Sequence, residues 1–128
     1  MQTAAQTSSR KDIAVGFLKQ AASGRLDEAY AKVTPAFRHH NAYFAGDAES
    51  LKAGMAAAHQ QFPNTNIEVH HALEDGDLVA IHSRVSHGPD QPDIAVVHLF
   101  RFEHDRIAEL WDVGMQAPAE LPNENGLF

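Results

Sequence analysis

Apolar residues recur at helical spacing in the first half of the chain. Ser9 precedes apolar positions spaced i, i+4, i+5 and i+8, and a glycine follows them, which predicts a first helix within residues 9–24. A shorter second helix is predicted over residues 26–33, where a proline then interrupts it because proline lacks the amide donor of an interior turn. Asp47 is placed to cap a third helix, which ends near residue 62 at a Pro-Asn pair.

The pattern then changes from helical spacing to alternation. Alternating segments at residues 67–73, 78–87, 94–103 and 106–115 are separated by short polar turns, and they predict four antiparallel strands. Three helices followed by a meander of strands give an α+β class, in which the helices cover one face of a strongly curved sheet. Such a cone-shaped α+β barrel can hold a small ligand, and a solid core without a cavity is the alternative.

The chain of 128 residues has the length of one domain and shows no internal repeat or boundary, so a single domain is predicted over residues 1–128. Residues 1–8 are small and polar and are predicted to form a flexible tail. The segment 116–128 is rich in Pro, Asn and Glu but ends in two apolar residues. We therefore expect this C-terminal segment to dock on the domain.

Charge and cysteine content argue against several classes of partner. The formal net charge of −7 disfavours nucleic acid, because neutralising phosphates requires clustered Lys and Arg. No apolar run approaches the roughly 20 residues that span a bilayer, and the first residues lack the apolar stretch of a secretory signal. The absence of cysteine excludes disulfide and thiolate chemistry and favours a cytoplasmic location.

Strand alternation gives a prediction for the polar residues inside the strands. Asp112 shares a strand face with Leu110, whereas the neighbouring tryptophan faces the other side. His98 shares a face with Phe100 and other apolar residues, and His82 is likewise in phase with apolar neighbours. Each of the three polar groups thus falls on a mostly apolar face, which is the arrangement expected of a pocket wall.

A carboxylate and imidazoles in an apolar pocket suit acid/base chemistry. Burial disfavours the charged carboxylate, which makes Asp112 a better base at neutral pH. An imidazole beside it can orient the carboxylate or donate a hydrogen bond to a developing oxyanion. The structural alternative is that Asp112 pairs with Arg101 or Arg106, and that His82 and His98 are packing residues.

The nine histidines do not follow a metal-binding pattern, because none has the i, i+4 spacing or the cysteine partners of such motifs. We therefore predict neither a metal nor another cofactor. Each of two adjacent pairs, His39-His40 and His70-His71, can send one side chain at most toward a pocket. The remaining histidines are predicted to lie at the surface: His59, His87 and His104.

Several segments of the chain resemble one known family. They are residues 38–43 (RHHNAY), 77–83 (DLVAIHS), 95–101 (AVVHLFR), 106–112 (RIAELWD) and 123–128 (NENGLF). Together they resemble the SnoaL-like polyketide cyclases, in the branch of predicted SnoaL-like aldol-condensation enzymes within the nuclear transport factor 2-like superfamily. The resemblance extends over nearly the whole chain, and it implies an α+β cone that is often dimeric through the outer sheet face.

The resemblance also implies roles for particular residues. Asp112 matches the position of an acid/base aspartate, and His40 matches a His-Asn motif that lines the pocket, with Asn41 shaping the turn. Two positions depart from the family pattern. Ala42 replaces a proline, and His98 stands where relatives carry an acid, so a mechanism that needs two carboxylates is in doubt.

The leading hypothesis is an enzyme that performs aldol-type cyclisation, isomerisation or related chemistry on a small apolar carbonyl compound. Asp112 is the expected base, His98 and His82 polarise or orient, and His40 closes the mouth of the pocket. The alternatives are a ligand-binding module without catalysis and a structural dimer without a functional cavity. The side chains expected to contact the ligand are Phe17, Asn41, Tyr43, Met55, Phe100 and Leu110.

Overall fold

The computed structural model describes residues 8–128, so the predicted flexible tail lies outside the described residues except for Ser8. Within these residues, three helices and five strands follow one another. They are α1 (Arg10–Ala22), α2 (Leu26–Tyr30), β1 (Val33–His39), α3 (Ala48–Gln61), β2 (Asn66–Asp75), β3 (Leu78–Ser86), β4 (Ile94–Glu103) and β5 (Arg106–Gln116).

Two of the helices begin at the side chains that the sequence designates as caps. Ser9 Oγ accepts a hydrogen bond of 3.1 Å from the Asp12 amide at the start of α1. Asp47 accepts one of 3.0 Å from the Ser50 amide at the start of α3. The predicted extent of the second helix is wrong, because α2 ends at Tyr30 and the chain then enters the sheet.

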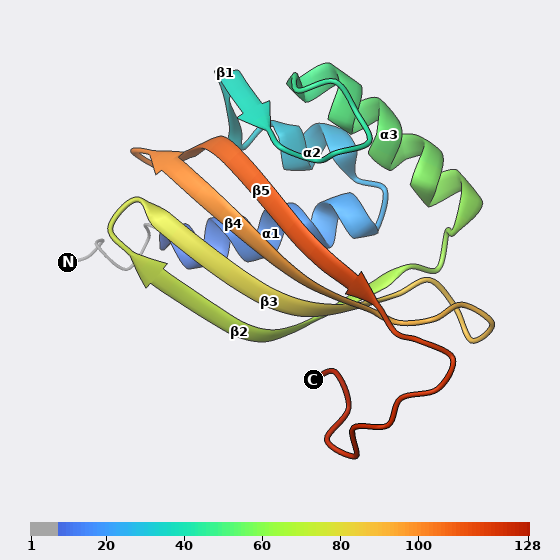
Figure 1. The fold of residues 1–128 in the computed structure, drawn as a ribbon. Helices are drawn as coiled ribbons and strands as arrows, with labels where there is room; N and C mark the ends of the chain where they lie inside the picture. The colour runs from blue at the N-terminus through green and yellow to red at the C-terminus, as the bar shows by residue number, and fades with distance from the viewer. Residues whose placement is uncertain (1–7) are drawn as a thin grey trace.

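The strands form one open sheet in the order β1-β5-β4-β3-β2 (Figure 1). β1 runs parallel to β5, and the other neighbours are antiparallel. The sequence pattern does not predict β1, because Pro35 and the polar residues around it hide the alternation of a strand. The strand can contain this proline because β1 lies at an edge of the sheet, where not every amide needs a ladder partner.

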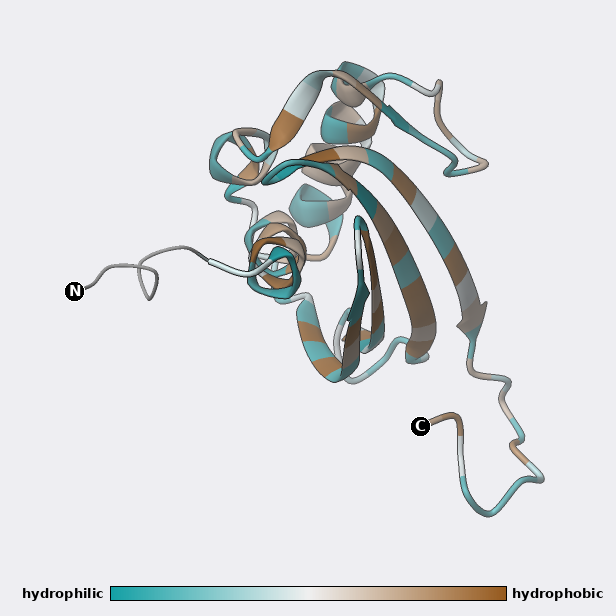
Figure 2. Cartoon of the chain, turned by 90° about the vertical axis from the view of Figure 1, so that its left-hand side faces the viewer, coloured by the Kyte–Doolittle hydropathy of each residue, from teal (hydrophilic) through white to brown (hydrophobic). Residues whose placement is uncertain are grey.

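The helices cover the inner face of this curved sheet, and the core fills the space between the two layers (Figure 2). Phe17 from α1 packs edge-to-face on Phe100 from β4, with ring centroids 5.9 Å apart. Both of these side chains and Leu110 are buried in the core cluster. The predicted α+β class is confirmed, but these three predicted ligand contacts are core residues.

Two β-bulges interrupt the alternation on which the strand predictions rest. Between β4 and β5 the register passes from Arg101↔Glu109 to Phe102↔Ile107, so Ala108 is an extra residue. Ile107 consequently joins the core, whereas alternation alone predicts that it faces outward with Trp111. A second irregularity lies in β2, between residues 69 and 71.

The C-terminal segment returns to the sheet after β5 (Figure 1). The Phe128 ring centroid lies 5.2 Å from that of His70 and 6.3 Å from that of His82. The Arg84 guanidinium lies 4.2 Å from the same Phe128 ring, a cation–π contact. Among residues 8–128, no helix has the length and apolar content needed to cross a membrane.

Candidate functional site

A cavity of about 350 Å³ opens between the last turns of α1 and α3 and the inner face of the sheet. This volume lies near the lower end of the roughly 300–1,000 Å³ typical of small-ligand sites. Most of the lining is apolar, including Leu18, Met55, Ile67 and Val85. The polar side chains that line it are Asn41, His59, Thr65, His87, His98 and Asp112.

His98 and Asp112 enter the cavity from adjacent strands. They are direct register partners of β4 and β5, and both lie on the face that the helices cover. Their neighbours on that face, such as Phe100 and Leu110, belong to the core. Both residues therefore line the cavity, on the strand face that alternation predicts.

The imidazole of His98 is held in its neutral form. Burial among apolar side chains lowers the pKa of His98 to about 4, and the nearby Asp112 carboxylate opposes this shift only in part. Nδ1 of His98 is buried without a hydrogen-bond partner among the described residues. At neutral pH the ring thus offers one N–H donor and one acceptor rather than a positive charge.

Asp112 is braced by Asn41, whose Nδ2 donates to Asp112 Oδ2 at 2.9 Å. The orientation of the Asn41 amide is fixed from its other end, since Oδ1 accepts from the Tyr43 backbone amide at 2.9 Å. The Asn41 backbone amide donates to His39 Nδ1 at 3.1 Å. His39 Nε2 must therefore carry the ring proton and donate to the Ala45 carbonyl, 2.6 Å away.

The structure places His40 outside the cavity, on the other side of the sheet. Its Nε2 lies 2.6 Å from Glu109 Oε2, and its ring stacks on Trp111 with centroids 5.0 Å apart. The predicted role of His40 at the pocket mouth is wrong, because in β1 it is His39 that faces inward and is buried. Tyr43, a predicted ligand contact, is 88% exposed.

Glu109 is the centre of the ion-pair cluster that holds His40. Its carboxylate accepts hydrogen bonds from Arg38 and Arg101 as well as contacting His40, at distances from 2.6 to 3.3 Å. Hydrogen bonds from Arg38 and then His40 lower the pKa of Glu109 to about 2, against the opposing effect of burial. The cluster fastens the end of β1, and hence the Asn41 loop, to β5.

His82 also lies on the outer face of the sheet. Ile81 and Ser83, its neighbours in β3, are fully buried on the inner face, so His82 must point away from the cavity. Its Nδ1 lies 3.0 Å from Nδ1 of His71, and the two rings are stacked. The prediction for His82 failed because its apolar neighbours in phase, such as Ala80, belong to the outer face.

Two histidines predicted at the surface line the cavity instead. His59 follows Met55 by four residues on α3, and His87, just after the end of β3, follows Val85 by two. These spacings place each histidine on the same face as a cavity residue, a signal that the sequence contained. His104, the third member of that group, lies in the exposed turn after β4 with φ of 57°.

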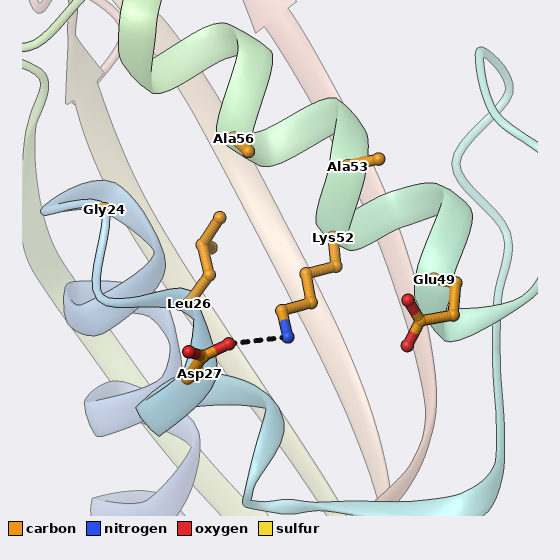
Figure 3. Close-up of a pocket in the computed structure, with 7 residues that line it drawn as sticks. All are labelled: Gly24, Leu26, Asp27, Glu49, Lys52, Ala53 and Ala56. Carbon is orange, nitrogen blue, oxygen red and sulfur yellow. Dashed lines mark ion pairs between the residues drawn. The ribbon is translucent and has the colours of Figure 1, made fainter.

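The cavity is distinct from a more open hollow of about 400 Å³ between α2 and α3 (Figure 3). There Lys52 Nζ, the one cation among the residues that line the hollow, pairs with Asp27 Oδ1 at 2.8 Å, which leaves the Glu49 carboxylate as the other charged group. Within residues 8–128, no group of three or more His, Asp or Glu side chains is arranged to hold a metal ion. The cavity is therefore the candidate site.

A family model described as the SnoaL-like domain matches residues 14–110, which is well over half of the chain. The chain belongs to the SnoaL-like domain family. No curated protein matches this SnoaL-like domain. The family match ends at Leu110, two residues before Asp112, so the position of Asp112 at the cavity comes from the structure and not from the match.

Solved structures share the fold of this SnoaL-like domain at low sequence identity. An uncharacterised cystatin-fold protein from Novosphingobium aromaticivorans is 21% identical with a TM-score of 0.73, over 84% of this chain and 99% of that one. A SnoaL-like protein of unknown function from Burkholderia thailandensis is 18% identical with a TM-score of 0.69, over 85% and 98%. IdmH from Streptomyces antibioticus, a candidate polyketide cyclase, is 22% identical with a TM-score of 0.66, over 84% and 92%.

Proposed function

We propose that this SnoaL-like domain is an acid/base enzyme that acts on a small, largely apolar carbonyl compound bound in the cavity. The observation that carries the proposal is the meeting of His98 and Asp112, as register partners, in one apolar cavity where Asn41 fixes the carboxylate. The reaction class is aldol-type cyclisation or isomerisation, both of which begin with removal of a proton next to a carbonyl.

Each polar group has a distinct part in this scheme. The Asp112 carboxylate accepts the proton from the carbon next to the carbonyl, and the electron pair of the broken C–H bond moves toward the carbonyl oxygen. His98 remains neutral because its pKa is lowered to about 4, and its N–H donates a hydrogen bond to the enolate oxygen. Asn41 does not transfer a proton but holds one Asp112 oxygen, which leaves the other for the substrate.

One carboxylate is sufficient for such a reaction. Once protonated, Asp112 can return its proton to another carbon of the enolate in an isomerisation, or to the alkoxide formed in an aldol addition. A histidine at position 98, where the family resemblance suggests a second acid, therefore changes how the oxyanion is stabilised and does not prevent the chemistry. The likeness to the fold of IdmH, a candidate polyketide cyclase, is consistent with this class of reaction.

The test uses a panel of small aromatic and aliphatic ketones and β-ketoesters. Turnover is measured by NMR in deuterated water, as the rate at which the proton next to the carbonyl exchanges. Asp112→Asn keeps the shape of the side chain but removes the base, so exchange should fall by roughly 10²- to 10⁴-fold. His82→Gln is the matched control, since His82 lies on the outer face and its loss should leave exchange unchanged.

Two outcomes would contradict catalysis by this site. Equal exchange rates in the wild type and in Asp112→Asn would remove Asp112 from the mechanism. Binding of ketones without exchange in either protein would instead favour a ligand-binding module that uses the same cavity.

A further inference from the structure

The cavity has a second polar end, which the proposed mechanism does not use. His87 follows the end of β3, and Thr65 precedes β2, so the two meet where α3 passes into the sheet (Figure 1). His98 lies four residues from Ile94, or about 13 Å along β4 at roughly 3.3 Å per residue. Ile94 pairs with Val85 of β3, and His87 lies two residues beyond Val85 along the chain. His87 and His98 therefore approach the cavity from opposite ends.

A hydrogen-bonded relay fixes the protonation of His87. Thr65 Oγ1 lies 2.8 Å from the Phe62 carbonyl oxygen and 2.8 Å from His87 Nδ1. A hydroxyl has a single hydrogen, and the carbonyl can only accept, so Thr65 donates to Phe62. The remaining contact is satisfied only when His87 Nδ1 carries a proton and donates it to Thr65.

The same relay leaves Nε2 of a neutral His87 as an unprotonated acceptor. Nε2 forms no hydrogen bond with any of the residues 8–128. The ring cannot turn away easily, because it stacks on Phe62 with centroids 4.6 Å apart and an interplanar angle of 23°. An oriented acceptor without a partner, beside an apolar cavity, fits a ligand group that donates a hydrogen bond.

We propose that His87 Nε2 forms a subsite for a hydroxyl group of the ligand, so that the ligand is a hydroxylated carbonyl compound held at both ends. The assignment of the carbonyl to the Asp112 end rests on the proposed function, whereas the His87 subsite stands on its own geometry. The cavity of about 350 Å³ would hold a dozen water molecules at roughly 30 Å³ each. The ligand therefore has on the order of a dozen non-hydrogen atoms, as in a hydroxylated bicyclic ketone.

The first test needs no ligand. Nitrogen NMR of the imidazole side chains should show His87 protonated at Nδ1 and unprotonated at Nε2 near pH 8. Thr65→Val keeps the size of residue 65 but removes the hydroxyl, and the tautomer preference of His87 should then weaken. A wild-type His87 protonated at Nε2 would overturn the subsite, since no acceptor would remain for the ligand.

The second test compares two probes, tetralone and a hydroxytetralone whose phenol lies across the rings from the ketone. Calorimetry on the wild type should show the hydroxytetralone binding about three- to tenfold more tightly. His87→Phe preserves stacking on Phe62, so it should abolish this preference while tetralone binding stays unchanged. A preference for the hydroxytetralone that survives in His87→Phe would overturn the proposal. So would a wild type without this preference, including a wild type that binds neither probe.

The two proposals fail separately in this design. Asp112→Asn should keep the preference for the hydroxytetralone even if it loses exchange activity. A protein that shows the preference but no exchange would retain the His87 subsite and lose the proposed catalysis. His82→Phe serves as the matched control for His87→Phe, because His82 lies on the outer face of the sheet, away from the cavity.

Discussion

Asn41 and Asp112 are joined by a hydrogen bond of 2.9 Å although 71 residues separate them in the chain. The contact links the loop after β1 to the last strand of the sheet, and it orients the only carboxylate among the residues that line the cavity. The two halves of the candidate site are therefore fixed by one side-chain pair rather than by the sheet alone.

Removing this amide should destabilise the fold. We expect Asn41→Ala to lower the free energy of unfolding by about 1–3 kcal/mol, because it leaves a partly buried carboxylate without its donor. Asn41→Asp should cost more, because two carboxylates would face each other at pH 7. Urea unfolding at pH 7 measures both effects, and an Asn41→Ala variant as stable as the wild type would contradict the bracing role.

His98 should make the protein sensitive to mild acid. Its pKa is lowered from 6.5 to about 4 by burial, so between these values the unfolded chain binds a proton that the folded one does not. Stability should consequently fall as the pH drops from 6.5 to 4, by at most about 3 kcal/mol from this residue. His98→Phe should reduce the dependence of unfolding free energy on pH, whereas His104→Gln, at an exposed position, should preserve it. An equal pH dependence in the wild type and both variants would show that His98 is not buried as a neutral group.

Glu109 should stabilise the protein through its contacts with Arg38, Arg101 and His40. Its side chain is 6% exposed, so we expect Glu109→Gln to lower the free energy of unfolding by about 1–3 kcal/mol. Because the pKa of Glu109 is lowered to about 2, the loss of unfolding free energy in Glu109→Gln should be largest above pH 4.5 and should disappear as the pH falls toward 2.

The matched control for this substitution is Glu103→Gln. Glu103 also contacts Arg101, but its side chain is 59% exposed, so its loss should change stability by less than about 0.5 kcal/mol. Similar losses in the two variants, measured by urea unfolding at pH 7, would rule out a special contribution from the buried carboxylate.

The outer face of the sheet is expected to form a homodimer. Val113 and Met115 on β5 are 73% and 61% exposed, and Val97, which pairs with Val113, is 41% exposed. Sedimentation should show a dimer at micromolar concentration, and Val113→Glu should produce a monomer by placing a charge in the apolar contact. Tyr43→Glu, at an exposed loop position, should remain dimeric, and a wild-type monomer would contradict the prediction.

Local signals in the sequence were sufficient for most of the fold. Caps such as Ser9 and Asp47 act through hydrogen bonds within a few residues, so the helix starts could be predicted without tertiary information. β1 could not be found in this way, because an edge strand with a proline is stabilised by its pairing with β5 and not by its own pattern. The bulges escaped prediction for the same reason.

The candidate site was only partly accessible to the same reasoning. Alternation placed His98 and Asp112 correctly because both lie beyond the bulge in a regular part of the sheet. It misplaced His82, because both faces of β3 contain apolar residues and the sequence does not say which one the helices cover. His40 was assigned from a family motif, and the motif did not determine which member of the His39-His40 pair faces inward.

The bulge at Ala108 has a consequence for how the chain can change in length. Ile107 and Asp112 are five positions apart, so an uninterrupted strand would present them on opposite faces, and only the additional residue lets both face inward. Deleting Ala108 would leave the flanking pairs in register and keep Asp112 at the cavity. A deletion of Leu110 or Trp111 would also remove the bulge and keep Asp112 inward, but it would turn Glu109 toward the core and away from Arg101. Insertions and deletions among relatives should therefore concentrate at this bulge, where the chain can lose a residue without losing its chemistry.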